Sequence, residues 1–386
     1  MVPGLAPMLI EGQSFIDKQD ELSVAEFMQK YGMPKRINEE IFIAMGKALD
    51  FTDPDKLSMS VILTAMNRFI NEADGSQTAF IDGNQPDRLC KPMVEHISAR
   101  GGQVLTGKPI SSIEVNPNDN SVKHLILADG SIVEADMYVS AMPVDIVKRL
   151  IPKPWSTIPY FRQLSELEGI PVINLQIWFD TKLTSVDGLC FSRSPLLSVY
   201  ADMSTCCEEY ASDKASMLEL VFAPATEAVG ADRNWIAASD EEIIDAALIE
   251  LQRLFPTEIG LNAPDGGAQV TKSSVVRTPR SVYATTPGRN KFRPSQESPI
   301  SNFVMAGDFA MQKYLGSMEG AVLSGKLAAE VISDKANGKS TNGPREVHSS
   351  IGNNNGDEIE PVGVRGNYPI AFGGGQQEIG PNPSHP

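Results

Sequence analysis

Asp308 is the residue whose type and position in this sequence most clearly suggest chemistry. It follows the apolar run Phe303–Ala306 and Gly307, a pattern that predicts a buried strand ending at a carboxylate. From Ser317 small residues recur at helical spacing, which predicts a helix that packs closely against a neighbour. A helix start offers N–H donors and partial positive charge to phosphate or flavin oxygens, and Asp308 could accept hydrogen bonds from sugar-type hydroxyls. An ordinary strand and helix with a capping Asp fits the same pattern equally well.

The glycine-rich turn G-x-G-x-x-G, which lets a backbone approach a pyrophosphate, does not occur in the sequence. The densest glycine cluster, Gly373–Gly375, follows no predicted strand and lies in a polar tail. We therefore expect that the chain begins partway through a longer protein, whose preceding part holds the first half of a cofactor site.

Composition and charge argue against several classes of function. Lys and Arg number 33 against 49 Asp and Glu, so the formal charge of -16 disfavours binding to nucleic acid. The four cysteines show no C-x-x-C spacing and the four histidines are scattered, so we predict neither a metal site nor a Ser/His/Asp triad. The longest apolar run, Val172–Phe179, has the length of a strand rather than of a membrane-spanning helix.

The first hundred residues have apolar positions three and four apart, which predicts a helical region from about 22 to 100. Ser23 and Asn38 are expected to cap helix starts, and Gly32 and Gly101 stand where C-terminal glycines are expected.

Beyond this region the apolar period shifts toward two. Strands are predicted over 103–107 and 110–115, and a hairpin is predicted at Asp129 and Gly130. Further strands are expected over 171–180, 196–203 and 216–225, with an amphipathic helix over 240–256. From about 337 the sequence is rich in Asn, Gly, Pro and Ser, which is typical of disorder.

Several long segments together resemble the plant and algal type of phytoene desaturase, an FAD-dependent family of the carotenoid pathway. They include EEIFIAMGKALDF, NRFINEADGSQTAFIDGN, FSRSPLLSVYADMS and QKYLGSMEGAVLSGK, and the similarity runs from about residue 4 to residue 332. The related ζ-carotene desaturases share the last motif, but the second segment is closer to the phytoene enzymes.

The resemblance implies a mixed α/β fold, in which a partial Rossmann-like FAD-binding domain is interleaved with a substrate domain, as in flavin amine oxidases. Residues 1–100 would form the helical part of the substrate or membrane-facing domain. Residues 101–145 would return to the FAD-binding domain, 146–300 would form the substrate-binding domain, 301–335 the last FAD-binding strand and helix, and 336–386 a disordered tail.

The implied activity is desaturation of 15-cis-phytoene to ζ-carotene through phytofluene, with electrons passing to FAD and then to plastoquinone. No side chain is expected to be catalytic, because an oxidised flavin N5 held against an allylic carbon carries the chemistry. The resemblance also implies a plastid enzyme that docks on one face of a membrane through an apolar patch, and it allows a homo-oligomer.

Five residues match functional positions of the family. Asp308, Gly307 and Met318 match cofactor-binding positions, whereas Arg68 and Gly316 match the substrate or quinone pocket. The family usually has alanine at Gly316, so a slightly wider pocket is expected here. The structural alternative for Arg68 is an ion pair with Glu72 at i+4 on a helix surface.

The absent glycine-rich turn favours two further expectations. The chain by itself should bind FAD weakly or not at all, since the pyrophosphate contacts belong to that turn. A competing hypothesis is a non-catalytic relative that keeps an apolar groove and binds a carotenoid or quinone.

Overall fold

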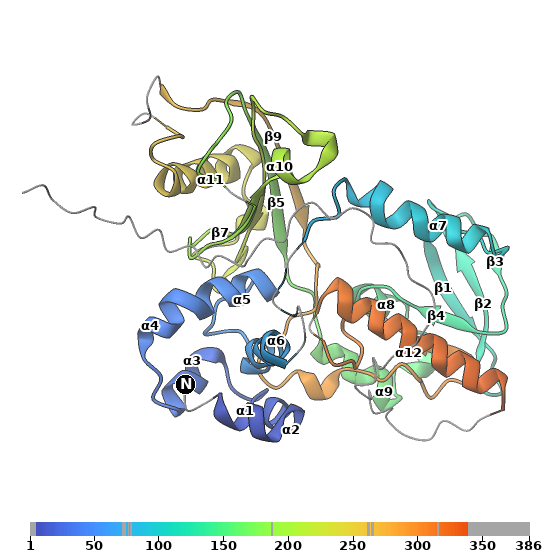
Figure 1. The fold of residues 1–386 in the computed structure, drawn as a ribbon. Coiled ribbons are helices and arrows are strands. Elements are labelled where there is room, and N and C mark those ends of the chain that lie inside the picture. The colour runs from blue at the N-terminus through green and yellow to red at the C-terminus, as the bar shows by residue number, and fades with distance from the viewer. Residues whose placement is uncertain are drawn as a thin grey trace, which may run out of the picture.

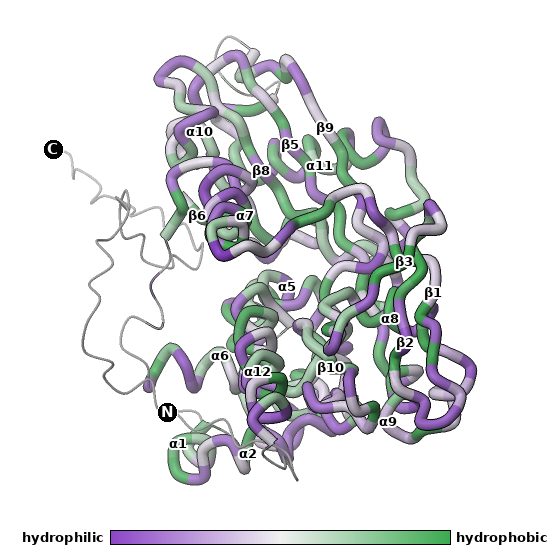
Figure 2. Tube along the Cα trace, turned by 90° about the vertical axis from the view of Figure 1, so that its right-hand side faces the viewer, coloured by the Kyte–Doolittle hydropathy of each residue, from purple (hydrophilic) through white to green (hydrophobic). Residues whose placement is uncertain are grey.

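The computed structural model describes residues 5–71, 75, 77, 79–186, 188–260, 263, 266–314 and 316–338. In Figures 1 and 2 a sheet containing β5, β7 and β9 lies above the N-terminal helices, and a mixed part carrying β1–β4 and α12 lies beside them. This mixture of sheets and helices agrees with the predicted α/β class.

The N-terminal helices pack around one apolar cluster. They are α1 (Ala6–Glu11), α2 (Gln13–Lys18), α3 (Val24–Lys30), α4 (Lys35–Ile37), the π-helical turn η1 (Asn38–Phe42), α5 (Ile43–Asp50) and α6 (Met59–Asn71). Ser23 caps α3 as predicted, because its Oγ accepts from the Glu26 N–H at 3.2 Å while Glu26 accepts from the Ser23 N–H at 2.8 Å. The glycine predicted to follow this helix, Gly32, has a positive φ of 60°.

The predicted cap at Asn38 is wrong. Pro34 is extended and the chain turns helical at Lys35, so Asn38 lies inside the continuous run of α4, η1 and α5 with φ -63° and ψ -48°. Proline fixes its own φ and is well suited to a helix start, which moves the start upstream of Asn38.

The upper sheet has, among the described residues, the strand order β6-β7-β8-β5-β9, with every pair antiparallel. Its strands are β5 (Val172–Phe179), β6 (Leu189–Phe191), β7 (Leu197–Asp202), β8 (Met217–Phe222) and β9 (Val270–Thr278). Alternate side chains of β5, from Ile173 to Phe179, are buried and share a core with α11 (Asp240–Leu254), which begins with a capping box at Ser239 and Glu242. The predicted strands β5, β7 and β8 and the helix α11 are therefore confirmed.

The part beside the N-terminal helices begins with the π-helical turn η2 (Pro86–Cys90) and α7 (Lys91–Ser98), which form one exposed helical run. A meander of β1 (Ile110–Val115), β2 (Val122–Leu127) and β3 (Ile132–Val133) follows, with the predicted turn at Asp129 and Gly130 between β2 and β3. The strand predicted over 103–107 is wrong: this segment pairs with no strand in the described part of the chain, and Leu105 is 64% exposed.

Strand β4 (Tyr138–Ser140) pairs in parallel with β10 (Phe303–Met305), which joins segments far apart in the sequence. The long helix α12 (Met318–Ala336) packs behind β10 through Ala328 and Val331. A second apolar cluster, centred on the fully buried Trp155, underlies the pair.

Shorter helices connect these elements. They are α8 (Val144–Leu150), η3 (Lys153–Trp155), α9 (Pro159–Arg162), η4 (Gln163–Glu166), α10 (Met203–Cys206), η5 (Glu208–Tyr210), η6 (Glu227–Val229), η7 (Trp235–Ala237) and η9 (Asn290–Phe292). None of the helices in the described ranges has the length and apolarity that crossing a bilayer requires. The predicted tail lies outside the described residues from 339 onward, and the predicted domain boundaries stay predictions.

Candidate flavin and substrate site

The connection between β10 and α12 carries four of the five predicted site residues. Gly307 and Asp308 directly follow β10, and Gly316 and Met318 flank Ser317, whose Oγ accepts from the Gly320 N–H at 3.1 Å and caps α12. The other N–H groups in the first turn of α12 have no acceptors inside the helix, as at any helix start. The predicted strand, carboxylate and small-residue helix are therefore present in that order.

Gly307 allows the close approach of β10 to α12. Its N–H donates to the buried Ser324 Oγ at 3.2 Å. Its φ is 135°, and a Cβ atom there would lie 2.9 Å from the Phe309 ring. Both the backbone angle and this contact require glycine.

The Asp308 carboxylate is partly buried beside this glycine. Its Oδ2 accepts from the Tyr283 N–H at 3.2 Å, and no side chain in the described part of the chain donates to it. Burial raises the pKa of Asp308, although backbone N–H groups and the charge of Arg293 oppose the rise. The carboxylate therefore keeps acceptor capacity for a hydroxyl-bearing ligand.

Arg293 holds the turn that carries Asp308. The Arg293 side chain is buried, and its guanidinium carbon Cζ lies 5.1 Å from the centre of the Tyr283 ring. The guanidinium donates to the backbone carbonyls of Asp308 at 3.2 Å, Phe309 at 3.3 Å, Ala310 at 2.7 Å and Gln312 at 3.5 Å. A rigid planar donor with five N–H groups is suited to fix several carbonyls at once. No spacing pattern in the sequence points to Arg293.

A second acid, Asp50 at the end of α5, lies close enough to Asp308 to interact with it electrostatically. Asp50 is fully buried, and its Oδ2 accepts from the hydroxyl of Thr285 and, at 3.2 Å, from the Thr285 N–H. Burial raises the pKa of Asp50 to about 8, and the charge of Asp308 adds to the rise. Asp50 thus ties the N-terminal helices to the segment that contacts Asp308, and the sequence analysis missed it.

Gly316 lies between Asp308 and the Tyr283 ring. A Cβ atom at Gly316 would be 3.2 Å from the ring and 3.5 Å from Asp308 Oδ2. An alanine at this position would require the ring to shift by a few tenths of an ångström. The Tyr283 ring therefore already fills the room beside Gly316, and the wider pocket expected from the sequence stays a prediction.

Arg68, the fifth predicted residue, reaches this connection from the end of α6. Its Nη1 donates to Oε2 of Glu319 in the first turn of α12, and its guanidinium lies 5.2 Å from the centre of the Tyr314 ring. The alternative partner considered for Arg68, Glu72, lies outside the described residues. Met318, the neighbour of Glu319, is 68% exposed and its Sδ accepts from Gln85 Nε2 at 3.4 Å. Four of the five predicted residues therefore lie within 307–319, and Arg68 contacts this segment through Glu319.

Residues 6–333 match the family of flavin containing amine oxidoreductases. The chain belongs to this family. The α/β fold class and the flavin cofactor predicted from the sequence are confirmed by the match.

The resemblance to phytoene desaturases is also confirmed. The chain is 56% identical over 330 residues to a 15-cis-phytoene desaturase of Solanum lycopersicum, covering 85% of this chain and 55% of that protein. It is 52% identical over 334 residues to a 15-cis-phytoene desaturase of Synechococcus elongatus, covering 85% of this chain and 68% of that protein. A probable zeta-carotene desaturase of the same cyanobacterium is 29% identical over 335 residues, covering 81% of this chain and 67% of that protein. The chain thus spans little more than half the length of the plant relative.

Among solved structures, cyclohexylamine oxidase from Brevibacterium oxydans superposes with a TM-score of 0.61 at 15% identity, covering 87% of this chain and 76% of that one. At this identity the likeness concerns the fold alone.

The residues present fit a flavin. Asp308 keeps lone pairs for hydroxyl donors, and the long helix α12 begins ten positions after it, so the N–H groups of the helix start belong to the same segment. No group of three or more His, Cys, Asp or Glu in the described residues is arranged to hold a metal ion.

Proposed function

We propose that this chain carries the substrate domain and the C-terminal part of the FAD site of a 15-cis-phytoene desaturase. The observation that carries the proposal is the meeting of Arg68 with the 307–319 segment, because it joins a predicted substrate-pocket residue to the predicted flavin residues. The identities of 52% and 56% to enzymes named for this reaction support the substrate class. The 29% identity to a zeta-carotene desaturase supports that alternative less well.

When bound, FAD supplies the acceptor for the hydrogen removed from the hydrocarbon. The proposed task of this chain is to hold the flavin and to shield it from water. Asp308 would accept hydrogen bonds from the ribityl or diphosphate region, and the start of α12 would face electron-rich oxygens of the flavin. Gly316 and the Tyr283 ring would form an apolar wall, which suits a substrate without polar groups.

Arg68 would serve the electron acceptor rather than the hydrocarbon. A C40 hydrocarbon offers a guanidinium no acceptor, whereas a quinone carbonyl does. The Arg68 side chain is about one third exposed, so a ligand can reach it. We therefore assign Arg68 to the binding of plastoquinone.

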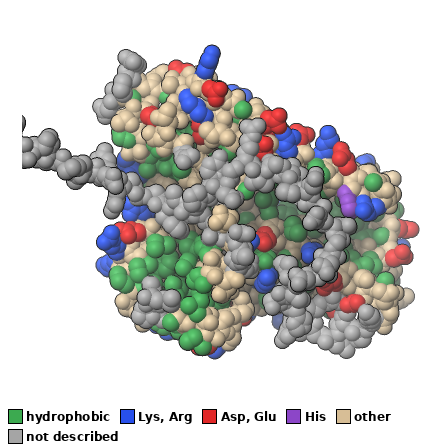
Figure 3. Space-filling view, viewed as in Figure 1, with side chains coloured by type: hydrophobic (Ala, Val, Ile, Leu, Met, Phe, Trp, Pro, Cys, Tyr) green, Lys and Arg blue, Asp and Glu red, His purple; other side chains and the backbone are tan. Residues whose placement is uncertain are grey.

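Docking on a membrane surface would bring both apolar compounds to the site. Figure 3 shows hydrophobic side chains gathered over the N-terminal helices. Large apolar side chains exposed on these helices include Leu9 at 40%, Ile10 at 85% and Ile70 at 51%. An exposed patch of this kind supports binding to one face of a membrane. The plant relatives are named as chloroplastic or chromoplastic, which supports a plastid location, and a homo-oligomer stays a prediction.

A chimera tests the proposed activity. In the Synechococcus enzyme the region matched over 334 residues would be replaced by this chain and expressed in bacteria that accumulate phytoene. We expect phytofluene and ζ-carotene to form, as measured by chromatography of the extracted pigments. A chimera that binds FAD yet leaves phytoene unchanged would overturn the proposed activity.

The same chimera separates the competing functions. A ζ-carotene desaturase would instead consume added ζ-carotene and leave phytoene untouched. A non-catalytic binder would retain carotenoid or quinone on purification without converting either. Asp308→Ala should weaken FAD binding by about 1 to 3 kcal/mol, the usual scale for a lost charged hydrogen bond, whereas Asp245→Ala on the exposed face of α11 should leave it unchanged.

A further inference from the structure

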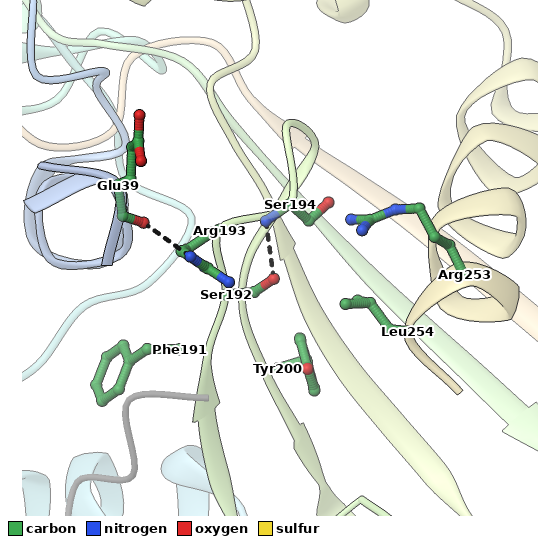
Figure 4. A pocket seen from close by; sticks show the side chains of 8 residues that line it. All are labelled: Glu39, Phe191, Ser192, Arg193, Ser194, Tyr200, Arg253 and Leu254. Atoms are coloured by element: carbon green, nitrogen blue, oxygen red, sulfur yellow. Dashed lines mark hydrogen bonds between the residues drawn. The ribbon is translucent and has the colours of Figure 1, made fainter. Parts of the chain in front are cut away.

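A polar pocket lies away from the candidate flavin site, where the upper sheet meets the N-terminal helices. It has a volume of about 340 Å³ and is lined by Glu39, Phe191, Ser192, Arg193, Ser194, Tyr200, Arg253 and Leu254. Figure 4 shows that its walls come from η1, the turn between β6 and β7, and the end of α11. Neither the proposed desaturation nor the proposed membrane patch uses these residues.

Two arginines line this pocket from different elements: Arg193 comes from the turn between β6 and β7, and Arg253 comes from the end of α11 (Figure 4). Arg193 donates from Nη1 to the backbone carbonyl of Glu39 at 3.2 Å, and within the described part of the chain it forms no ion pair. Arg253 donates from Nε and Nη2 to the Glu250 carboxylate at 3.2 and 2.7 Å, which leaves its Nη1 for another acceptor.

The acids near the pocket already have hydrogen-bond or ion-pair partners, or point away from Arg193. Glu250 accepts from Arg253 and, at 2.6 Å, from Ser194 Oγ; burial opposes its ionisation, but these hydrogen bonds prevail and lower its pKa. Asp53 pairs at 3.1 Å with Lys47, whose Nζ also donates to the Ser194 carbonyl at 3.4 Å. The Glu39 carboxylate points away from Arg193 in Figure 4.

The remaining lining adds neutral donors and apolar surface. Burial raises the pKa of Tyr200, so its hydroxyl stays protonated at neutral pH. Phe191 and Leu254 are partly buried and would contact the carbon part of an ester. Arginine matches the oxygens of a phosphate through parallel N–H donors, which makes a phosphate group the best chemical match to a pocket lined by two arginines.

We propose that this pocket binds the phosphate group of a small ester, held between Arg193 and Arg253. The same chemistry is offered by a soluble phosphate ester and by the headgroup of an anionic phospholipid. The overall negative charge of the chain disfavours non-specific attraction of anions, so binding would depend on these two side chains.

The proposal is tested by titrating the 386-residue chain with inorganic phosphate in a calorimeter. Chloride at equal ionic strength is the reference. We expect Arg193→Gln and Arg253→Gln each to weaken phosphate binding at least tenfold. Arg162→Gln is the matched control, since Arg162 is an exposed arginine of α9 outside the pocket, and it should leave binding unchanged. Arg193→Gln breaks no ion pair, which makes it the variant least expected to disturb folding.

Vesicles distinguish the two sources of phosphate. Phosphatidylcholine vesicles with and without phosphatidylglycerol would be floated with the wild type and the three variants. Binding that requires phosphatidylglycerol and Arg193, and that inorganic phosphate reverses, indicates a lipid headgroup; phosphate binding without vesicle competition indicates a soluble ester. The proposal is overturned if the wild type binds neither probe, or if both pocket variants bind as the wild type does. Neither measurement involves flavin or phytoene, so failure here leaves the proposed desaturase activity untouched.

Discussion

Arg68 of α6 and Glu319 of α12 form an ion pair although 251 positions separate them in the sequence. The pair joins the end of the N-terminal helical region to the first turn of the helix proposed to face the flavin. Glu319 directly follows Met318, and the Tyr314 ring lies 5.2 Å from the guanidinium. The contact places Arg68, the proposed quinone-binding residue, beside the proposed cofactor-binding segment 307–319. Substitution of Arg68 can therefore be followed through the reoxidation of the flavin.

Arg68→Ser is expected to slow the reoxidation of reduced flavin by quinone in the chimera, because it removes the proposed donor to the quinone carbonyl. Phytoene should still reduce the flavin in a single turnover, since the hydrocarbon makes no hydrogen bond. Stopped-flow absorbance of the two half-reactions measures both. Arg162→Ser, an exposed position of α9, serves as control. If Arg68→Ser leaves the quinone half-reaction at the wild-type rate, the role of Arg68 is structural.

The ion pair itself should contribute little to stability. The side chains of Arg68 and Glu319 are 35% and 45% exposed, and pairs so accessible to solvent contribute about 0.2 to 1 kcal/mol. A double-mutant cycle with Arg68→Ser and Glu319→Gln, followed by urea unfolding, measures the coupling free energy. A coupling above about 2 kcal/mol would contradict a solvent-screened pair.

Two glycines at the start and middle of the β10–α12 unit should respond oppositely to alanine. Gly307→Ala is expected to lower the free energy of unfolding by about 1 to 3 kcal/mol, because φ is 135° and the added Cβ meets the Phe309 ring. Gly325→Ala, inside α12 with no atom within 4 Å of the added Cβ, should raise it by up to about 1 kcal/mol. Chemical unfolding of both variants checks the signs, and equal effects would refute the local explanation.

The elements of this unit could be predicted because their signals are local. Ser317 caps α12 by accepting a hydrogen bond from the N–H of Gly320, which is only three positions later in the sequence. The apolar run before Asp308 predicts a strand from its composition alone. The strand β9 was not predicted, since its segment carries polar residues and only pairing with β5 stabilises it. The opposite error occurred at 103–107, where an apolar pattern finds no strand partner among the described residues.

The candidate site was predicted at single positions, from a local pattern or from the family resemblance. Asp308 follows a predicted strand and Arg68 lies in a family motif, but their proximity depends on packing between distant segments. Arg293 was missed because it contacts the turn after β10, and Asp50 was missed because it contacts Thr285. No periodic pattern in the sequence links either residue to its partner. Long-range hydrogen bonds of this kind leave no spacing in the sequence.

Arg293→Lys is expected to lower the free energy of unfolding by about 1 to 3 kcal/mol. A lysine keeps the charge but presents one compact ammonium, so it cannot reach the carbonyls of Asp308, Phe309 and Ala310 together and leaves buried acceptors unsatisfied. Urea unfolding measures the loss. Arg162→Lys on the exposed surface of α9 should change stability by no more than about 0.5 kcal/mol. Equal effects of the two substitutions would remove the proposed role of Arg293.

Asp50 should make stability depend on pH in the direction opposite to that of a salt-bridged acid. Its pKa is raised by burial to about 8 in the folded protein, against about 4 in an unfolded chain. Between about pH 4 and pH 8 the unfolded chain releases a proton that the folded chain retains. The free energy of unfolding therefore falls as pH rises through this window, by up to about 1.4 kcal/mol per pH unit, and this contribution becomes constant above pH 8.

Asp50→Asn keeps an acceptor for Thr285 and removes the titration. Relative to the wild type, this variant should gain stability between pH 5 and pH 8, as measured by urea unfolding at both values. The pKa values of Asp53 and Asp308 are also raised by burial, but both acids remain in the variant, so their contributions largely cancel in the comparison. Asp245→Asn on the exposed face of α11 provides the control, and its stability should follow that of the wild type across this range. If Asp50→Asn also runs parallel to the wild type from pH 5 to pH 8, Asp50 is ionised in the folded protein, and the coupling to Asp308 must be reassigned.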